Sequence, residues 1–476
     1  GGAGTQALTI ADGALTGTAQ QRVLEFTGTI SGNRIITFPL LTENFYIIKN
    51  GTSGAYTVQL KAVSGSGATV TFAADDKGYK IIYLDGVATN TGVFDAALSS
   101  AGITFKEGGT NFTNSLLVGT DSTGTLNSAD GNTGVGTGVF GALTTGDNNV
   151  AVGFNSLDLN TTGSSNTSIG KDSLKSNTTG AGNTSVGMGT LYSNTTASYN
   201  TAIGSLALDT NTTGASNTAV GYDALTANSS GSNNTAVGGN ALDANTTGLN
   251  NTTVGYDSLT SNTTGASNVA MGNQAMFDNT TGNNNVGVGC DALANNTTAS
   301  NNTAVGCGAL HKNTTGSTNT AAGQRASACN TTGDSHSAFG FEALKTNTTG
   351  GNNTAVGYRS AYLNTTGSDN TALGWSSLCV NTTASSNTAI GYQALRKTED
   401  GGSNTAIGYN AGCNNTGGSG NTALGKNTQV GVTGSNNSSI GDGASSSSNT
   451  AANQMTLGNG SIDNLRCNDT SISGLS

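Results

Sequence analysis

An apolar residue followed by glycine recurs at a fixed interval along most of the chain. Steps of 17 residues from Gly119 land on glycine eighteen times in succession and reach Gly425. A step that is shorter by one residue then reaches Gly441, and another full step reaches Gly458. The consensus unit reads N-T-A-V-G-Y-x-A-L-x-x-N-T-T-G-x-x. Such a strict period indicates a repeat architecture.

Each unit predicts one short strand and one turn, because T-A-V favours extended backbone and N-T-T-G favours a turn. We expect two large apolar side chains per unit to point inward. These are the residue before the glycine, such as Val152, and the leucine four positions after it, such as Leu157. Two such residues cannot form a core alone, but stacked units can. The pattern therefore predicts a parallel β-solenoid or β-roll of about twenty rungs over residues 119–441.

Two further positions of the unit carry structural expectations. Glycine is expected where the backbone has a positive φ or approaches another backbone closely. Asparagine recurs four positions before the glycine, as at Asn166, and seven after it, as at Asn160. These columns are expected to form amide ladders along the solenoid, because a thin core leaves polar groups in need of partners.

The flanking segments differ from the repeat. Residues 1–103 contain alternating runs such as Arg34–Phe38 and Tyr56–Leu60, and Asn50-Gly51 and Asp85-Gly86 read as turns between strands. They predict a compact N-terminal β-sandwich. Residues 104–118 are interpreted as a connector and residues 442–476 as a separate C-terminal segment, so the whole chain is expected to be all-β.

Composition narrows the functional classes. Charged residues make up 9% and hydrophobic residues 34% of the chain, against about 25% and 45–50% in ordinary globular proteins. An enzyme with a conventional packed core is therefore not expected. The net charge of −10 without a basic stripe argues against a nucleic-acid partner, and no apolar run is long enough for membrane insertion.

Histidine and cysteine are too sparse to indicate a metal site. The chain has two histidines, His311 and His336, and six cysteines without a CxxC pair. No cofactor is expected, and His336 is interpreted as a replacement for asparagine in one rung. Cys290 and Cys307 are one repeat apart and fall on adjacent rungs. We expect them to be buried free thiols rather than a disulfide, because in-register side chains point in parallel.

Three stretches resemble known families. The N-T-A-V-G rung resembles the N-S-V-A-I-G strand of trimeric autotransporter (YadA-like) adhesin heads, and N-T-A-I-G-Y-Q-A-L at 387–395 resembles repeats of phage tail fibres. The block from Ile36 to Gly86 resembles a β module common in phage fibres. The terminal L-R-C-N-D-T-S-I-S-G-L-S resembles the junction before the intramolecular chaperone of endosialidase-type tail fibres, which is cut off after a serine.

These resemblances imply a trimeric phage tail fibre for host-cell attachment. They imply self-association into a homotrimer, tail or adaptor proteins at the N-terminal end, and a host surface glycan or protein as receptor. They also imply a virion, extracellular location and a mature C-terminus at Ser476 after loss of the chaperone. From the residues, we expect a trimer that buries the small-residue column of Ala202, Ala219 and Ala236.

Three other functions remain open. A polysaccharide-degrading tailspike would need two carboxylates about 5–10 Å apart, for which Asp334 with Glu342, or Glu399 with Asp400, are the candidates. A bacterial trimeric surface adhesin would share the fold. An ice-binding surface is the remotest, because the threonines lie beside asparagine in turns rather than in a clean T-x-T strand.

The position after the glycine is aromatic on five successive rungs and is the candidate receptor-binding column. One hypothesis is an aromatic ladder that stiffens the shaft or fills a trimer core, since the position shares strand parity with an apolar residue expected to be buried. The other is a strip that stacks on sugar rings, with Arg359 and Asn410 as hydrogen-bonding neighbours. The column consists of Phe341, Tyr358, Trp375, Tyr392 and Tyr409.

Overall fold

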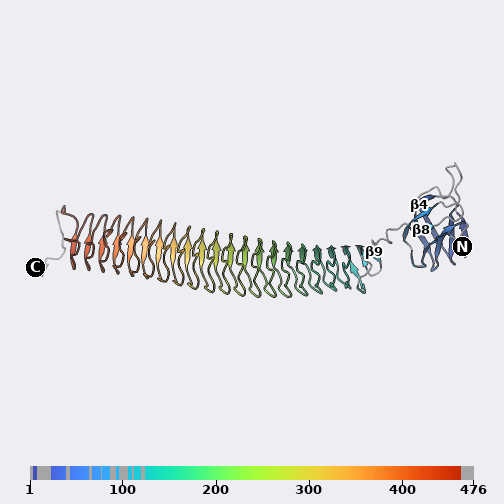
Figure 1. Cartoon of the computed structure of the whole chain (residues 1–476), viewed down its shortest axis with the longest axis horizontal. Coiled ribbons are helices and arrows are strands. Elements are labelled where there is room, and N and C mark those ends of the chain that lie inside the picture. Colours follow the sequence, from blue (N-terminus) through green and yellow to red (C-terminus); the bar gives the residue numbers. More distant parts are fainter. Residues whose placement is uncertain are drawn as a thin grey trace, which may run out of the picture. The chain divides into compact units, whose positions relative to one another are not determined.

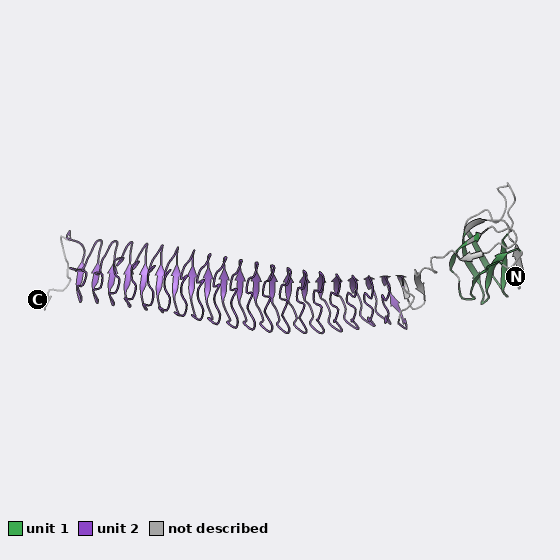
Figure 2. Ribbon diagram, viewed as in Figure 1, with its two compact units in different colours: residues 1–104 green, residues 105–476 purple. Residues whose placement is uncertain are grey.

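The chain is all-β. The computed structural model describes residues 4–7, 23–38, 43–63, 67–76, 78–85, 93–95, 105–109, 112–119 and 124–461. These residues contain strands β1 to β31 and no helix (Figure 1). They divide into two compact units, residues 1–104 and residues 105–476 (Figure 2).

The first unit contains two four-stranded sheets with the orders β1-β3-β5-β6 and β2-β4-β7-β8. Both sheets mix parallel and antiparallel pairs; β3 and β5 are parallel, whereas β5 and β6 are antiparallel. The strands are β1 (Gly4–Ala7), β2 (Val23–Thr29), β3 (Arg34–Phe38), β4 (Glu43–Ser53), β5 (Val58–Ala62), β6 (Val70–Phe72), β7 (Tyr79–Asp85) and β8 (Val93–Asp95).

One hydrophobic cluster joins the two sheets of this unit. Phe38 on β3 and Tyr46 on β4 contact each other with ring centroids 5.3 Å apart, and Leu60 and Ile82 belong to the same buried cluster. The turn expected at Asn50-Gly51 is wrong, because both residues lie inside β4. The buried Asn50 side chain instead donates to the backbone carbonyl of Asp76 and accepts from Thr52. Asn50 thus forms hydrogen bonds inside the unit and does not form a turn.

The second unit is a parallel β-solenoid. The short strands from β12 to β31 each pair in parallel register with the next, usually one full repeat further along the chain, as Thr167 pairs with Thr184. One step is shortened by a single residue, where Thr422 pairs with Ser438. Figure 1 shows the resulting stack of similar turns. The expected parallel solenoid with one rung per repeat unit is confirmed.

The solenoid strands occupy equivalent positions in successive rungs. They are β12 (Thr133–Val135), β13 (Val150–Val152), β14 (Thr167–Ile169), β15 (Thr184–Val186), β16 (Thr201–Ile203), β17 (Thr218–Val220), β18 (Thr235–Val237), β19 (Thr252–Val254), β20 (Val269–Met271), β21 (Val286–Val288), β22 (Thr303–Val305), β23 (Thr320–Ala322), β24 (Ser337–Phe339), β25 (Thr354–Val356), β26 (Thr371–Leu373), β27 (Thr388–Ile390), β28 (Thr405–Ile407), β29 (Thr422–Leu424), β30 (Ser438–Ile440) and β31 (Met455–Leu457).

The segment interpreted as a connector contains strands of the second unit. These are β9 (Phe105–Gly109) and β10 (Phe112–Val118), followed by the short β11 (Ala129–Asp130). β10 pairs antiparallel with β9 and parallel with β11 and β12. A hairpin thus covers the unpaired edge of the first solenoid strand, an edge that would otherwise be open to pairing with another chain.

In the strands from β12 to β30 the middle residue is buried and its two neighbours are at least partly exposed, whereas in β31 the middle residue is also partly exposed. Ala202 is fully buried, whereas the next residue, Ile203, is 41% exposed. Strand alternation allows only one of the two to face the core. The expectation that the residue before the glycine is buried is therefore wrong. So is the expectation of a bare alanine face, because Ala202, Ala219 and Ala236 lie in the solenoid's own core.

Leucine from the turn and alanine from the strand form that core. Leu208 and Leu225, four positions after the glycine, are fully buried beside the alanine column. Two asparagine ladders complete it, as expected. Asn177 Nδ2 donates to Asn160 Oδ1 at 2.7 Å and to the carbonyl of Gly180. In the other column the backbone N–H of each asparagine donates to the side-chain oxygen one rung earlier, which removes unpaired polar groups from the interior.

The repeat glycine has both of the expected features, a positive φ and a close approach to another backbone. Gly306 has φ +130°, and a Cβ there would lie 2.7 Å from the backbone carbon of Gly323 on the next rung. Other positions of the rung also have positive φ without being reserved for glycine. In one rung they are Ser165 (60°), Asp172 (55°) and Leu174 (48°). Inter-rung hydrogen bonds, such as Leu174 N–H to the carbonyl of Thr190 at 2.9 Å, hold this uncommon backbone in place.

Candidate receptor-binding surface

The five aromatic side chains of the candidate column form one continuous stack. Their ring centroids are 5.4, 5.7, 4.9 and 5.0 Å apart in order, and their planes lie within 10° of parallel. The spacing follows from the solenoid, because parallel strands are about 4.8 Å apart and identical positions superpose. The structure thus brings together all five predicted residues: Phe341, Tyr358, Trp375, Tyr392 and Tyr409.

The stack lies on the outside of the solenoid. Trp375 is 42% exposed, and Val356, which precedes the repeat glycine before Tyr358, is 39% exposed. The rings form a ladder, but shared parity does not place them in the core of the single solenoid, because the residue before the glycine is itself outside. Burial of the ladder in a trimer core stays a prediction. Within the stack each inner ring is covered on both faces by its neighbours, so the rings present mainly their edges to the exterior.

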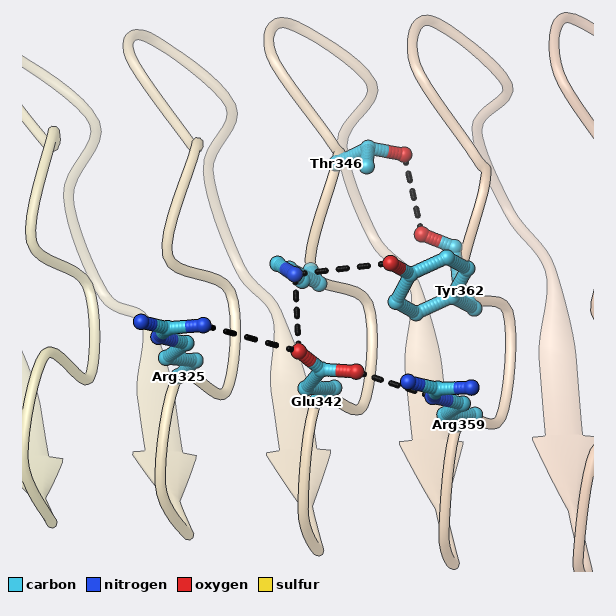
Figure 3. A network of polar contacts seen from close by, with 6 residues as sticks. Arg325, Glu342, Thr346, Arg359 and Tyr362 are labelled. Carbon is cyan, nitrogen blue, oxygen red and sulfur yellow. Dashed lines mark hydrogen bonds and ion pairs between the residues drawn. The ribbon is translucent and has the colours of Figure 1, made fainter.

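A buried carboxylate lies beside the stack and binds two cations. Glu342 is 3% exposed, and its oxygens accept from Lys345 Nζ at 2.7 Å and from Arg359 Nε at 2.8 Å. Arg325 Nη1 lies 4.0 Å from the same carboxylate (Figure 3). Burial pulls the pKa of Glu342 up, but the hydrogen bonds from Lys345 and Arg359 outweigh it, so its pKa lies below the usual value.

Arg359 connects this carboxylate to the aromatic rings. Its guanidinium lies 5.3 Å from the ring centroid of Tyr358 and 5.1 Å from that of Tyr362, within the range of cation–π attraction. The hydrogen bond to Glu342 raises the pKa of Arg359 further. Arg359 is therefore held between the Tyr358 ring and Glu342. Figure 3 shows its contact with the carboxylate, and its side chain remains partly exposed.

The other predicted hydrogen-bonding neighbour is also fixed in the shaft. The backbone N–H of Asn410 donates to the carbonyl of Tyr392 at 2.8 Å. Its side-chain oxygen is buried without a hydrogen-bond partner among the described residues. Asn410 thus lies at the same end of the stack as Tyr409, but its oxygen is not directed to the exterior.

The candidate catalytic carboxylates Asp334 and Glu342 have different hydrogen-bond partners. Glu342 is bound by cations, and its lowered pKa is the opposite of what a general acid requires. Asp334 Oδ1 accepts the backbone N–H of Ser317 at 2.6 Å. Glu399 and Asp400 are both exposed at a turn. None of these contacts joins two carboxylates around a common space.

Histidine and cysteine occupy rung positions with defined surroundings. His336 is buried in the asparagine column, and its Nε2 lies 2.9 Å from Asn347 Nδ2, so it has partners that the sequence did not indicate. Cys290 and Cys307 are free, but both are exposed. The expectation that they are buried is wrong, because they belong to the outward column that becomes aromatic from Phe341 onward.

The charged network around Glu342 was missed by sequence reasoning, although a signal was present. Lys345 follows Glu342 at a spacing of three, and Arg325 and Arg359 are one repeat before and after it. Aligning the chain on its repeat places all four on adjacent rungs. The predicted processing end, Ser476, lies outside the described residues.

The described part of the chain lacks two kinds of feature. It contains no cluster of three or more histidine, cysteine or acidic side chains placed to hold a metal ion. Nor does this part contain a helix of the length and hydrophobicity needed to cross a membrane. Comparison with known proteins gives no match to a family model, a curated protein or a solved structure.

Proposed function

We propose that this chain is a structural virion protein, a trimeric phage tail fibre that attaches to the host cell through its shaft. The observation that carries the proposal is the stack from Phe341 to Tyr409. It is confined to five rungs of an otherwise regular rod, lies outside the core and has an ordered arginine beside it. Aromatic side chains with fixed polar neighbours are suited to binding glycan or protein surfaces.

An exposed apolar column supports the trimer. The residue before each glycine is apolar and partly exposed over the length of the solenoid, as in Ile203 (41%) and Ile407 (42%). A continuous apolar stripe on a soluble rod favours association. Three copies could bury these columns against one another around an axis parallel to the shaft. This replaces the alanine column as the basis for the trimer.

The N-terminal unit is proposed to be a β-sandwich module that joins the fibre to tail or adaptor proteins. Its two sheets share a single cluster of buried side chains, as expected for an independent module. In the same proposal the receptor is a host surface glycan or protein, and the location is the virion exterior.

Immunolabelling of phage particles tests the proposal. Antibodies raised against residues 119–441 should label phage tails and block adsorption to host cells, and sedimentation equilibrium of the purified chain should give three times the chain mass. Labelling of bacterial envelopes in place of phage tails would instead support a surface adhesin. A stable monomer at micromolar concentration would contradict the trimer.

A further inference from the structure

Charge is distributed unevenly along the solenoid. Residues 176–311 contain no lysine or arginine and six aspartates. Residues 312–397 contain six cations against three acids. The first four rings of the aromatic stack thus lie in a cationic region of an acidic chain, and this region ends before Glu399 and Asp400. The six cations are Lys312, Arg325, Lys345, Arg359, Arg396 and Lys397.

A surface pocket of about 300 Å³ lies at one end of this region. Small residues create it. Ala328 occupies the column that holds His311 on the preceding rung and Lys345 on the following rung, and Gly308 occupies the column of Arg325. Elsewhere the Ala328 column holds large side chains such as Phe277. The missing side-chain volume leaves a hollow on one side of the solenoid.

The charged residues in the pocket lining are mainly cations. They are Lys312, Arg325 and Lys345, with Asp291 as the acid, and His311 also lines the pocket. Arg325 is the least firmly paired of the cations that surround Glu342, because its side chain is 59% exposed and lies 4.0 Å from a carboxylate that already accepts two shorter bonds. Lys345 of the lining binds Glu342, which also binds Arg359, so the pocket and this ion-pair network together contain four permanent cations and two acids. An anion is therefore the ligand that this charge arrangement favours.

The pocket extends along the solenoid to the rung on which the aromatic stack begins, because Lys345 in its lining is on the same rung as Phe341. The aromatic stack begins at Phe341. The same position is occupied by Gln324 on the preceding rung and by Cys307 on the rung before that, and Cys307 lines the pocket. Phe341 is the ring whose face toward the pocket has no aromatic neighbour in the column. A ligand that combines an apolar ring face with an acidic group would contact both features.

We propose that this pocket binds the acidic group of an anionic glycan, with Arg325 and Lys312 as the principal contacts and Phe341 beside the sugar ring. The inference rests on the proposed host-attachment function and names the chemical class of its receptor. The volume lies at the lower end of the usual range of about 300–1,000 Å³ for ligand pockets, which suits one acidic sugar unit of a longer chain. Carboxylate and phosphate groups share the required chemistry.

Binding of defined saccharides to the full chain tests this. Calorimetry with oligogalacturonate, poly(glycerol phosphate) and neutral maltohexaose should give binding to at least one acidic ligand and none to the neutral one. The acidic ligand that binds identifies the carboxylate or the phosphate. Arg325→Gln combined with Lys312→Gln should weaken that binding about tenfold or more. Ala328→Phe should do the same by filling the pocket with charge unchanged, and Phe277 indicates that the column accepts this side chain.

A matched control separates the pocket from general electrostatics. Lys171→Gln removes an exposed cation (61%) on a distant rung and should leave the affinity unchanged. Three results would each overturn the proposal. The Lys171→Gln control loses as much affinity as the double variant, Ala328→Phe keeps its binding with an intact melting curve, or neither acidic ligand binds. If the fibre still adsorbs to host cells in that case, the attachment function stands and only the pocket assignment fails.

Discussion

His336 takes the place of asparagine in a buried ladder, and its Nδ1 faces the backbone N–H of Asn353 at 3.4 Å. The rungs on either side have Asn319 and Asn353 at this position. On other rungs the equivalent backbone N–H donates to an asparagine side-chain oxygen, as the N–H of Asn370 does to Asn353 Oδ1. A protonated imidazole cannot accept it, so the ladder requires neutral histidine at this rung.

His336 should make the stability of the solenoid depend on pH. Burial is the main cause that lowers its pKa from 6.5 to about 4, whereas in the unfolded chain it titrates near its ordinary value. The unfolded state therefore binds more protons between these values, and stability falls as the pH falls from about 6.5 to about 4. We expect a loss of about 3 kcal/mol over this window. Denaturant unfolding of wild type and His336→Asn at several pH values measures it.

The asparagine variant serves as the control, because it restores the repeat consensus. Its midpoint should change less than that of wild type as the solution is acidified through this window. Parallel pH profiles of the two proteins would show that the histidine does not titrate on unfolding in this range.

The second prediction concerns the ladder of asparagines seven positions after each repeat glycine, to which Asn262 belongs. Asn262 Nδ2 donates to Asn245 Oδ1 at 2.9 Å and to the carbonyl of Gly265 at 3.0 Å, and its Oδ1 accepts from Asn279 at 2.8 Å. Asn262→Ala leaves these buried partners unpaired at about 1–3 kcal/mol each. We expect a clear fall in the midpoint of denaturant unfolding. Asn273→Ala, at an exposed position, should leave it within error, and equal midpoints for both variants would argue against the ladder as a source of stability.

The third prediction concerns the repeat glycine. Gly306→Ala combines an unfavourable positive φ with a contact of 2.7 Å to the next rung's backbone, so the rungs must separate locally. Gly239→Ala lies one position after a repeat glycine, where φ is ordinary and the nearest atom is 3.4 Å away, in the side chain of Tyr256. Thermal melting should show strong destabilisation for Gly306→Ala and little change for Gly239→Ala. A wild-type-like melt of Gly306→Ala would show that the rungs are not tightly registered.

The sequence predicted the features that depend on the period. A strict repeat requires equivalent positions to stack, so the solenoid, the asparagine ladders and the alignment of the aromatic column all follow from spacing. Which side chains face inward did not follow. Residue type favours burial of Ile203 over Ala202, yet in so short a strand the alternation buries only the middle position.

The leucine that completes the solenoid core has a left-handed backbone conformation, which its residue type does not indicate. Leu174 has φ +48°, which is rare for leucine, and this backbone directs it into the space beside the alanine column. The left-handed backbone is stabilised by neighbouring rungs, so it is a property of the stack and could not be derived from a single unit. The charge network at Glu342 was accessible, by contrast, because its members are related by whole repeats.

The last prediction separates recognition from scaffolding in the aromatic stack. Trp375 stacks on Tyr358 and Tyr392 with centroids 5.7 and 4.9 Å away. Trp375→Ala removes two stacked pairs of about 0.5–1.5 kcal/mol each. In a chain of 476 residues this should move the melting midpoint by at most a few degrees. If the stack binds the receptor, adsorption of the fibre to host cells should nevertheless fall about tenfold or more.

Tyr256→Ala is the matched control for this variant. Tyr256 occupies the same column and is 56% exposed, but its neighbours in the column are Gly239 and Asn273, so it belongs to no stack. Its removal should change neither adsorption nor melting. Trp375→Phe should recover most of the adsorption, because a ring remains in the column. Unchanged adsorption in Trp375→Ala would show that the stack does not contact the receptor. A loss of adsorption accompanied by a large fall in melting midpoint would show that the stack stiffens the shaft. Either result would assign the stack to the scaffold.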